Sequence, residues 1–181
     1  MWGVSASSYQ IEGAARDEGK GPSIWDLISH RAYGSVADNT TGDIVAQHYY
    51  LYKQDLARIA NLGIPYFSPS FSWPRFFPFG AAGSPVNQEG VAHYDDVIAT
   101  MVDLGITPAV TLFHWDTPLA LFNAYGAWTS PEIVDDFFNY AKFVISRYDD
   151  YVPVWFTFNE RQYCFHFSRS PVTDELHSAI L

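Results

Sequence analysis

Apolar residues with helical spacing occupy three stretches of the chain. In the first stretch, apolar side chains recur every three or four residues, at Tyr49, Tyr52, Leu56 and Ile59. This spacing places them on one face of an α-helix. The same periodicity predicts helices over residues 49–61, 88–104 and 131–148. For the third helix, we expect Ser130 to be the N-cap and Pro131 the first helical residue.

Short apolar runs lie between these helices. We expect four strands, at Trp2–Ser7, Pro65–Trp73, Thr107–Phe113 and Val152–Phe158. The last three of these runs are continuously apolar, which is typical of strands that are buried on both faces, as in parallel sheets. A Leu-Gly-Ile triplet at 62–64 recurs at 104–106, and its glycine stands where each helix should end in a left-handed cap.

The predicted elements alternate as strand, loop, helix, strand, helix, strand, helix and strand. Repeated βα units of this kind form a doubly wound parallel sheet or a (β/α)8 barrel. The residues alone leave both architectures open. A whole barrel needs about 250 residues and eight strands, so four strands correspond to half of one.

Composition narrows the class of protein. The chain has 181 residues, 48% of them hydrophobic, which excludes intrinsic disorder and suits one domain. Ten Lys and Arg against 20 Asp and Glu leave a net charge of −10, which argues against nucleic-acid binding. The single cysteine, Cys164, excludes an internal disulfide. Since we find neither a secretory signal nor a membrane-spanning run, we expect a cytoplasmic protein that does not bind membranes.

Polar side chains follow the expected strands, where barrel enzymes carry their functional residues. They are Gln10, Arg75, His114, Asn159 and Glu160, with several indoles beside them. Amides, imidazoles and flat aromatic faces suit a neutral ligand with many hydroxyls. A carboxyl among aromatic residues suits a general acid. The glycine patterns of phosphate and dinucleotide loops and the spacing of metal-binding histidines do not occur, so we expect no cofactor and no metal.

A series of motifs, in order along residues 2–164, resembles glycoside hydrolase family 1, the β-glucosidases. The motifs are Trp2–Ala14, Gly21–Asp26, Ser72–Arg75, Thr111–Pro118, Tyr125–Trp128 and Thr157–Glu160. The segment Phe113–Leu121 is particularly similar to fungal members. The resemblance implies an α/β fold of the (β/α)8 TIM-barrel type. It also implies that residues 1–181 form a partial catalytic domain with about the first four βα units.

The resemblance implies a retaining β-glycosidase and assigns roles to individual residues. Glu160 matches the catalytic acid/base. Arg75 matches the arginine that orients the nucleophilic carboxylate and keeps it ionised, although an ordinary salt bridge is the alternative for this residue. The expected ligand is a β-glucoside or small oligosaccharide. The implied substrate-binding residues are Gln10, His114, Trp115, Trp128 and Asn159.

The chain departs from the family in three places. Retaining hydrolysis needs two carboxylates ~5–5.5 Å apart, but the Thr-Glu-Asn-Gly type of motif that carries the family's nucleophile does not occur here. The family usually has proline after the acid/base, whereas this chain has Arg161. A cation there favours an ionised Glu160, although a general acid must hold its proton. The tail at 165–181 no longer resembles the family.

Three hypotheses for function stay open. The chain is part of an active β-glucosidase whose nucleophile comes from a longer or second chain, a sugar-binding remnant without catalysis, or a truncated product without function. We expect the isolated chain to be inactive. Half a barrel exposes the edges of its first and fourth strands, which predicts self-association through those edges. Trp73 and Trp155 are assigned to the core rather than to a ligand.

Overall fold

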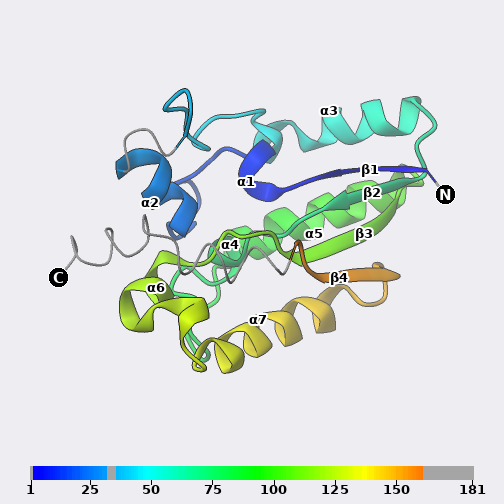
Figure 1. Cartoon of the computed structure of the whole chain (residues 1–181). Coiled ribbons are helices and arrows are strands. Elements are labelled where there is room, and N and C mark those ends of the chain that lie inside the picture. Colours follow the sequence, from blue (N-terminus) through cyan, green and yellow to red (C-terminus); the bar gives the residue numbers. More distant parts are fainter. Residues whose placement is uncertain (1, 32–35, 161–181) are drawn as a thin grey trace.

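Four parallel strands form one sheet in the order β1-β2-β3-β4, in a computed structural model that describes residues 2–31 and 36–160. The strands lie side by side in Figure 1, flanked by the three long helices α3, α5 and α7. The carboxyl ends of the strands share one edge of the sheet. The strands are β1 (Gly3–Ala6), β2 (Tyr66–Pro69), β3 (Thr107–Phe113) and β4 (Val154–Phe158).

The strand order decides between the two architectures that the sequence allows. In a doubly wound sheet, the order reverses at a switch point. Here each new strand is added on the same side, with Gly3 beside Tyr66, Tyr66 beside Thr107 and Ala109 beside Val154. Successive addition in one direction is the arrangement of a (β/α)8 barrel. The described residues therefore form a barrel segment of four strands.

The long helices agree with the predicted ranges except at one start. They are α3 (His48–Asn61), α5 (Gln88–Asp103) and α7 (Ile133–Tyr148). The predicted start of α7 at Pro131 is wrong, because Ser130 and Pro131 belong to a turn and Glu132 is the N-cap. Gly63 and Gly105 have φ angles of +70° and +71°, which confirms the left-handed ends of the first two helices.

The second strand is shorter than its apolar run suggested. It ends at Pro69, and the chain then enters the short helix α4 (Trp73–Phe76), so the predicted strand over Pro65–Trp73 is wrong at its end. Pro74 favours this change because proline suits the first turn of a helix. Four further short helices complete the described part: α1 (Ser8–Ile11), α2 (Ile24–Arg31), α6 (Leu119–Tyr125) and the 3₁₀ turn η1 (Ala127–Thr129).

Burial differs between the inner and the outer strands. The strand β3 is almost wholly buried, as predicted for a parallel sheet. The strand β4 is mostly exposed, so the prediction of burial on both faces is wrong for it, and β1, for which no such burial was predicted, is mostly exposed as well. The physical reason is their place in the sheet. Each has a neighbour on one side only within the described residues, and Phe156 of β4 is 49% exposed.

Aromatic side chains fill much of the core between the sheet and the helices. Trp73 is fully buried and stacks on Tyr140 with ring centroids 5.2 Å apart. Phe76 stacks on Tyr94 at 4.8 Å. Trp155 is partly buried and packs against the same core. The assignments of Trp73 and Trp155 to the core are therefore confirmed, and a large share of the aromatic residues serves packing.

No helix within residues 2–31 and 36–160 has the length and apolar character needed to cross a membrane.

Candidate functional site

An open groove of about 560 Å³ lies against the inner face of the sheet. Side chains from all four strands line it, together with residues beyond the strand ends, among them Gln10, His114 and Asn159. These three belong to separate βα units, yet the parallel sheet brings them to one place. The sequence predicted each of them as a sugar-binding residue. The structure thus brings together a carboxamide, an imidazole and a second carboxamide around one groove.

Gln10 lies on the single-turn helix α1 rather than at a strand end. Its side-chain oxygen accepts a hydrogen bond from Ser7 Oγ at 2.8 Å, and the residue is exposed to the groove. The hydrogen bond from the Ser7 hydroxyl therefore orients the carboxamide, with its oxygen toward Ser7. The amide nitrogen remains on the side where it can donate to a ligand oxygen.

His114 directly follows β3 and is half-buried. Burial lowers the pKa of His114, while the negative charge of Glu160 acts in the opposite direction. A neutral imidazole can donate one hydrogen bond and accept another, which suits sugar hydroxyls. Glu160 itself is exposed and is not among the described residues that line the groove. The sequence placed these two residues at neighbouring strand ends, and the structure does so as well.

Two residues at these strand ends have unusual backbone angles. Trp115 has φ +73° and Glu160 has φ +46°, in the left-handed region that non-glycine residues rarely adopt. Trp115 Nε1 donates a hydrogen bond to the Asn159 carbonyl at 2.9 Å, which holds the end of β3 against the end of β4. Such angles cost free energy and cluster at functional sites. Arg161, which the sequence analysis placed beside Glu160, lies outside the described residues, as does the tail at 165–181.

The two predicted pocket tryptophans lie beside the groove rather than in its lining, as far as the described residues show. Trp115 stacks on Trp25 with centroids 6.4 Å apart. Trp128 packs on Phe113 at 4.9 Å and on Phe158 at 5.3 Å. Its Nε1 donates to Thr117 Oγ1 at 2.9 Å. Their roles as sugar-binding residues stay predictions.

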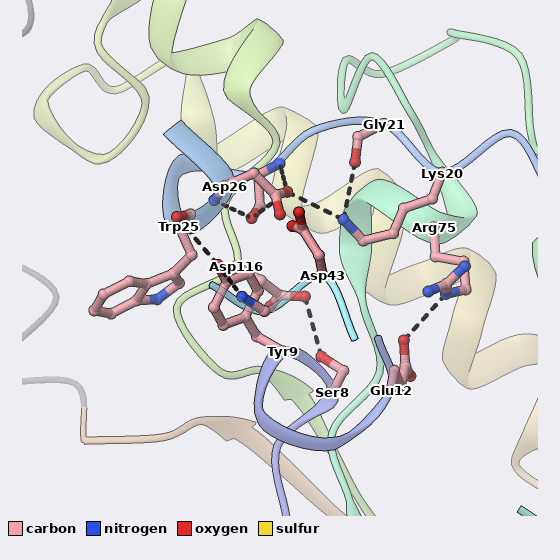
Figure 2. Close-up of polar contacts among 12 residues, drawn as sticks. Ser8, Tyr9, Glu12, Lys20, Gly21, Trp25, Asp26, Asp43, Arg75 and Asp116 are labelled. Atoms are coloured by element: carbon pink, nitrogen blue, oxygen red, sulfur yellow. Dashed lines mark hydrogen bonds and ion pairs between the residues drawn. The ribbon is translucent and has the colours of Figure 1, made fainter. Parts of the chain in front are cut away.

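Arg75 forms a buried ion pair with Glu12 (Figure 2). Its side chain is fully buried, and Nε lies 3.1 Å from Glu12 Oε2. The Tyr94 hydroxyl donates to the other Glu12 oxygen at 2.6 Å, and the guanidinium lies 4.1 Å from the ring centroid of Tyr49. The structure thus provides the salt bridge considered as the alternative for Arg75. Its Nη1 is buried without an acceptor among the described residues, and its role toward a nucleophile stays a prediction.

Sequence reasoning did not predict that two acidic side chains near these strand ends are buried. Glu12 and Asp116 are 5% and 1% exposed, and burial raises the pKa of Asp116 to about 6. Both stand within the motifs that resemble the family, but their types alone did not distinguish them from surface carboxylates. Within the described ranges, no group of three or more His, Cys, Asp or Glu side chains has an arrangement that could hold a metal ion.

Comparison with known proteins identifies relatives along most of the chain. The model of glycosyl hydrolase family 1 matches residues 1–172. Raucaffricine-O-β-D-glucosidase of Rauvolfia serpentina is 46% identical over 160 residues, which make up 88% of this chain and 30% of that protein. β-Glucosidase 12 of Oryza sativa subsp. indica is 40% identical over 88% of this chain and 31% of its own length. The chain thus spans about a third of the curated relatives that it matches.

Solved structures agree in fold. A β-glucosidase from Thermotoga maritima in complex with deoxynojirimycin matches with a TM-score of 0.84 and 42% identity, over 88% of this chain and 35% of that chain. β-Glucosidase 2 of the fungus Trichoderma reesei, in complex with Tris, matches with a TM-score of 0.85 and 40% identity, over 88% and 34%. The fold class, a segment of a (β/α)8 barrel, is confirmed. These identities do not set the fungal relative apart from the bacterial one.

Proposed function

Because this chain belongs to glycosyl hydrolase family 1, we propose that it is the part of a retaining β-glucosidase that carries the acid/base and much of the glucose-binding site. The substrate class is β-glucosides. The observation that carries the proposal is the groove. Gln10, His114 and Asn159 line it from three separate βα units, and Glu160 acts electrostatically on His114 from the end of β4.

In the proposed reaction, the Glu160 carboxyl donates its proton to the glycosidic oxygen as the bond to the anomeric carbon breaks. A second carboxylate attacks that carbon and forms a glycosyl-enzyme intermediate. Glu160, now ionised, takes a proton from water, and the water releases the sugar from the second carboxylate. We place that second carboxylate in a part of the protein outside these residues, since the chain corresponds to 30% of the length of its Rauvolfia serpentina relative. Its family motif does not occur in the 181 residues.

Sugar binding follows from the groups in the groove. The Asn159 and Gln10 carboxamides and the neutral His114 imidazole each offer both a donor and an acceptor. Sugar hydroxyls can donate and accept at the same time, so such groups can bind them as a set. The deoxynojirimycin and castanospermine held by the Thermotoga maritima structures support a sugar-like ligand for the corresponding part of this chain.

A second candidate function is sugar binding without hydrolysis. The three side chains that we propose to bind the sugar line the groove without any residue from outside the chain. The nucleophile is needed for bond cleavage and not for these contacts. The chain by itself can therefore be a binding module, even where the complete protein is an enzyme.

The test measures hydrolysis and binding separately. The purified chain is incubated with an aryl β-glucoside, and gluconolactone binding is measured by calorimetry on the wild type, Glu160→Gln and a control. The control is Glu89→Gln, an exposed carboxylate in the first turn of α5. We expect no turnover by the isolated chain and saturable binding of gluconolactone. Turnover that is lost in Glu160→Gln but kept in Glu89→Gln would contradict the binding-only alternative. Failure of a folded chain to bind gluconolactone would refute the proposed sugar site.

We also propose that the isolated chain associates with itself through the edges of β1 and β4. Among the described residues each of these strands pairs on one side only, and apolar side chains such as Trp2 and Phe156 are exposed beside them. Unpaired strand edges with apolar neighbours favour pairing with another chain. Light scattering across a range of concentrations tests this proposal, and a monomer at every concentration would refute it.

A further inference from the structure

A cluster of buried polar side chains lies behind the groove, between α1, α2 and the end of β3 (Figure 2). Asp116 Oδ2 accepts a hydrogen bond from Ser8 Oγ at 3.2 Å. Beside them, Lys20 Nζ lies 3.2 Å from Asp26 Oδ2, and this pair is largely buried. The side chains come from three separate segments of the chain, and their contacts are distinct from those that line the groove.

Hydrogen bonds through this cluster connect the ends of three strands. The Ser8 backbone amide donates to Ser70 Oγ at 2.8 Å, and Ser70 Oγ lies 3.2 Å from Ser8 Oγ. Ser70 directly follows β2, and Asp116 follows β3 after two residues. Ser8 begins α1, the turn that carries Gln10. The Ser8–Asp116 contact therefore connects the segment of Gln10 with the segment of His114.

A small, partly open cavity adjoins Asp116. Its volume is about 10 Å³, and its polar lining includes Ser8, Glu12, Lys20, Asp26, Ser72 and Asp116. Three buried oxygens of these residues, Asp116 Oδ1, Ser72 Oγ and Asp26 Oδ1, have no partner at full hydrogen-bond geometry among the described residues. The Ser72 hydroxyl is nevertheless close enough to the Asp116 carboxyl to lower its pKa. Asp116 and Ser72 are each only 1% exposed. A volume of about 10–15 Å³ holds one water molecule, and a buried water typically makes about three hydrogen bonds.

We propose that this cavity binds one water molecule, and that Asp116 and this water position the turn of Gln10 relative to His114. The water would donate two hydrogen bonds to the lining oxygens and accept one from the Ser72 hydroxyl. Leaving such buried atoms unpaired would be costly, because each has lost its contacts with solvent. Asp116 is thus a positioning residue, acting through Ser8 on Gln10. Its relevance to sugar binding rests on the proposed function, whereas the water site does not.

Neighbouring groups shift the pKa of Asp116 in both directions. Burial raises the pKa of Asp116 to about 6, and the Ser72 hydroxyl and the Lys20 ammonium act in the opposite direction. Glu12 also faces the cavity, and Tyr140 lies within electrostatic range of Asp116. A bound water can serve both forms of Asp116, since it can donate to a carboxylate and accept from a protonated carboxyl.

The first test measures amide hydrogen exchange by NMR in the full chain. Asp116→Asn keeps an oxygen acceptor for Ser8, whereas Asp116→Leu has a similar size and no polar atom. Asp116→Leu removes the contact with Ser8 Oγ and so takes about one net hydrogen bond from the turn. We therefore expect exchange of the Ser8 amide, which donates to Ser70 Oγ, to rise about tenfold in the leucine variant as the turn opens more often, and to stay near the wild-type value in the asparagine variant. Amides of Val97 and Ile98 in α5 report global stability, and Asp103→Asn, an exposed position, is the matched control.

Two further measurements separate this inference from the proposed function. A crystal structure at atomic resolution should show a water within hydrogen-bond distance of Asp116 Oδ1 and Ser72 Oγ, and a cavity without one would overturn the water site. If the wild type binds gluconolactone, we expect weaker binding in Asp116→Leu and recovery in Asp116→Asn. Equal Ser8 exchange in both variants would overturn the positioning role. If no sugar binds at all, the exchange and the crystal structure still decide the inference.

Discussion

The buried ion pair between Glu12 and Arg75 allows a sharp prediction about stability. Glu12→Gln removes the negative charge and keeps the size of the side chain. Arg75 is 0% exposed, so its guanidinium would stay buried without a counter-charge. The carbonyl oxygens of Gly13 and Ala14 lie 3.4 Å from its Nη2 and cannot replace a carboxylate. Removal of one partner of a buried pair costs about 3–5 kcal/mol.

The expected loss is large relative to the stability of a domain of this size, which is about 5–15 kcal/mol. Urea denaturation followed by tryptophan fluorescence measures it, with unchanged m values as the sign of an unchanged unfolding transition. The comparison is Arg58→Gln, which breaks the pair with Asp55. Arg58 is 68% exposed, and an exposed pair contributes less than about 1 kcal/mol. Both variants remove one partner of a single ion pair, so they differ mainly in burial.

A double-mutant cycle completes this prediction. Glu12→Gln combined with Arg75→Met removes both charges, and the apolar methionine suits the buried site. We expect the double variant to lose less unfolding free energy than the sum of the losses in the two single variants, because no buried charge is left unpaired. If the effects of the two single changes add, or if Glu12→Gln costs no more than Arg58→Gln, the reasoning from the buried pair is refuted.

Three other predictions concern stability. Burial raises the pKa of Asp116 from 3.8 to about 6, so the folded state binds the proton of the Asp116 carboxyl more tightly than the unfolded state does. The stabilisation of the fold by this proton is complete below about pH 4 and is lost as the pH rises through about 6. Relative to wild type, Asp116→Asn should therefore gain about 3 kcal/mol in unfolding free energy between pH 4 and 7; parallel pH curves would contradict this. Trp73→Ala should lose about 3–5 kcal/mol in urea denaturation, since Trp73 is fully buried against Tyr140; a loss below 1 kcal/mol would show that the core collapses around the cavity. Gly105→Ala should lower the free energy of unfolding by about 1 kcal/mol. The cost comes only from the backbone, because φ is +71° and the added methyl would meet no atom within 4 Å. An unchanged melting temperature would contradict this backbone cost.

The helices α3 and α5 and the strand β3 were predictable because their signals are local. The apolar period of three and four residues gave α3 and α5 to within one residue at each end. The run Thr107–Phe113 is β3 with the predicted bounds. The errors lie where local signals compete. At Pro131 a good first-turn residue stands outside the helix, and at Trp73 an apolar run continues past the end of its strand.

The candidate site was predictable in its members and less so in its arrangement. Gln10, His114 and Asn159 were expected at the groove because the carboxyl ends of parallel strands share one edge. Trp115 and Trp128 match the same motifs, yet their indole nitrogens bond to Asn159 and Thr117 beside the groove. Side-chain direction depends on backbone angles such as φ +73° at Trp115. No sequence pattern indicated that angle.

The sequence by itself determined the alternation of strands and helices, the family and the residue types that meet at the strand ends. These follow from periodicity and from motifs that each lie within a few consecutive residues. Only the tertiary structure decided that the strands add in one direction, that Arg75 pairs with Glu12, and that Asp116 lies beside Ser8. The reason is distance along the chain. Those partners lie 63 and 108 residues apart, so only the assembly of the parallel sheet brings them together, out of water, where their charges interact most strongly.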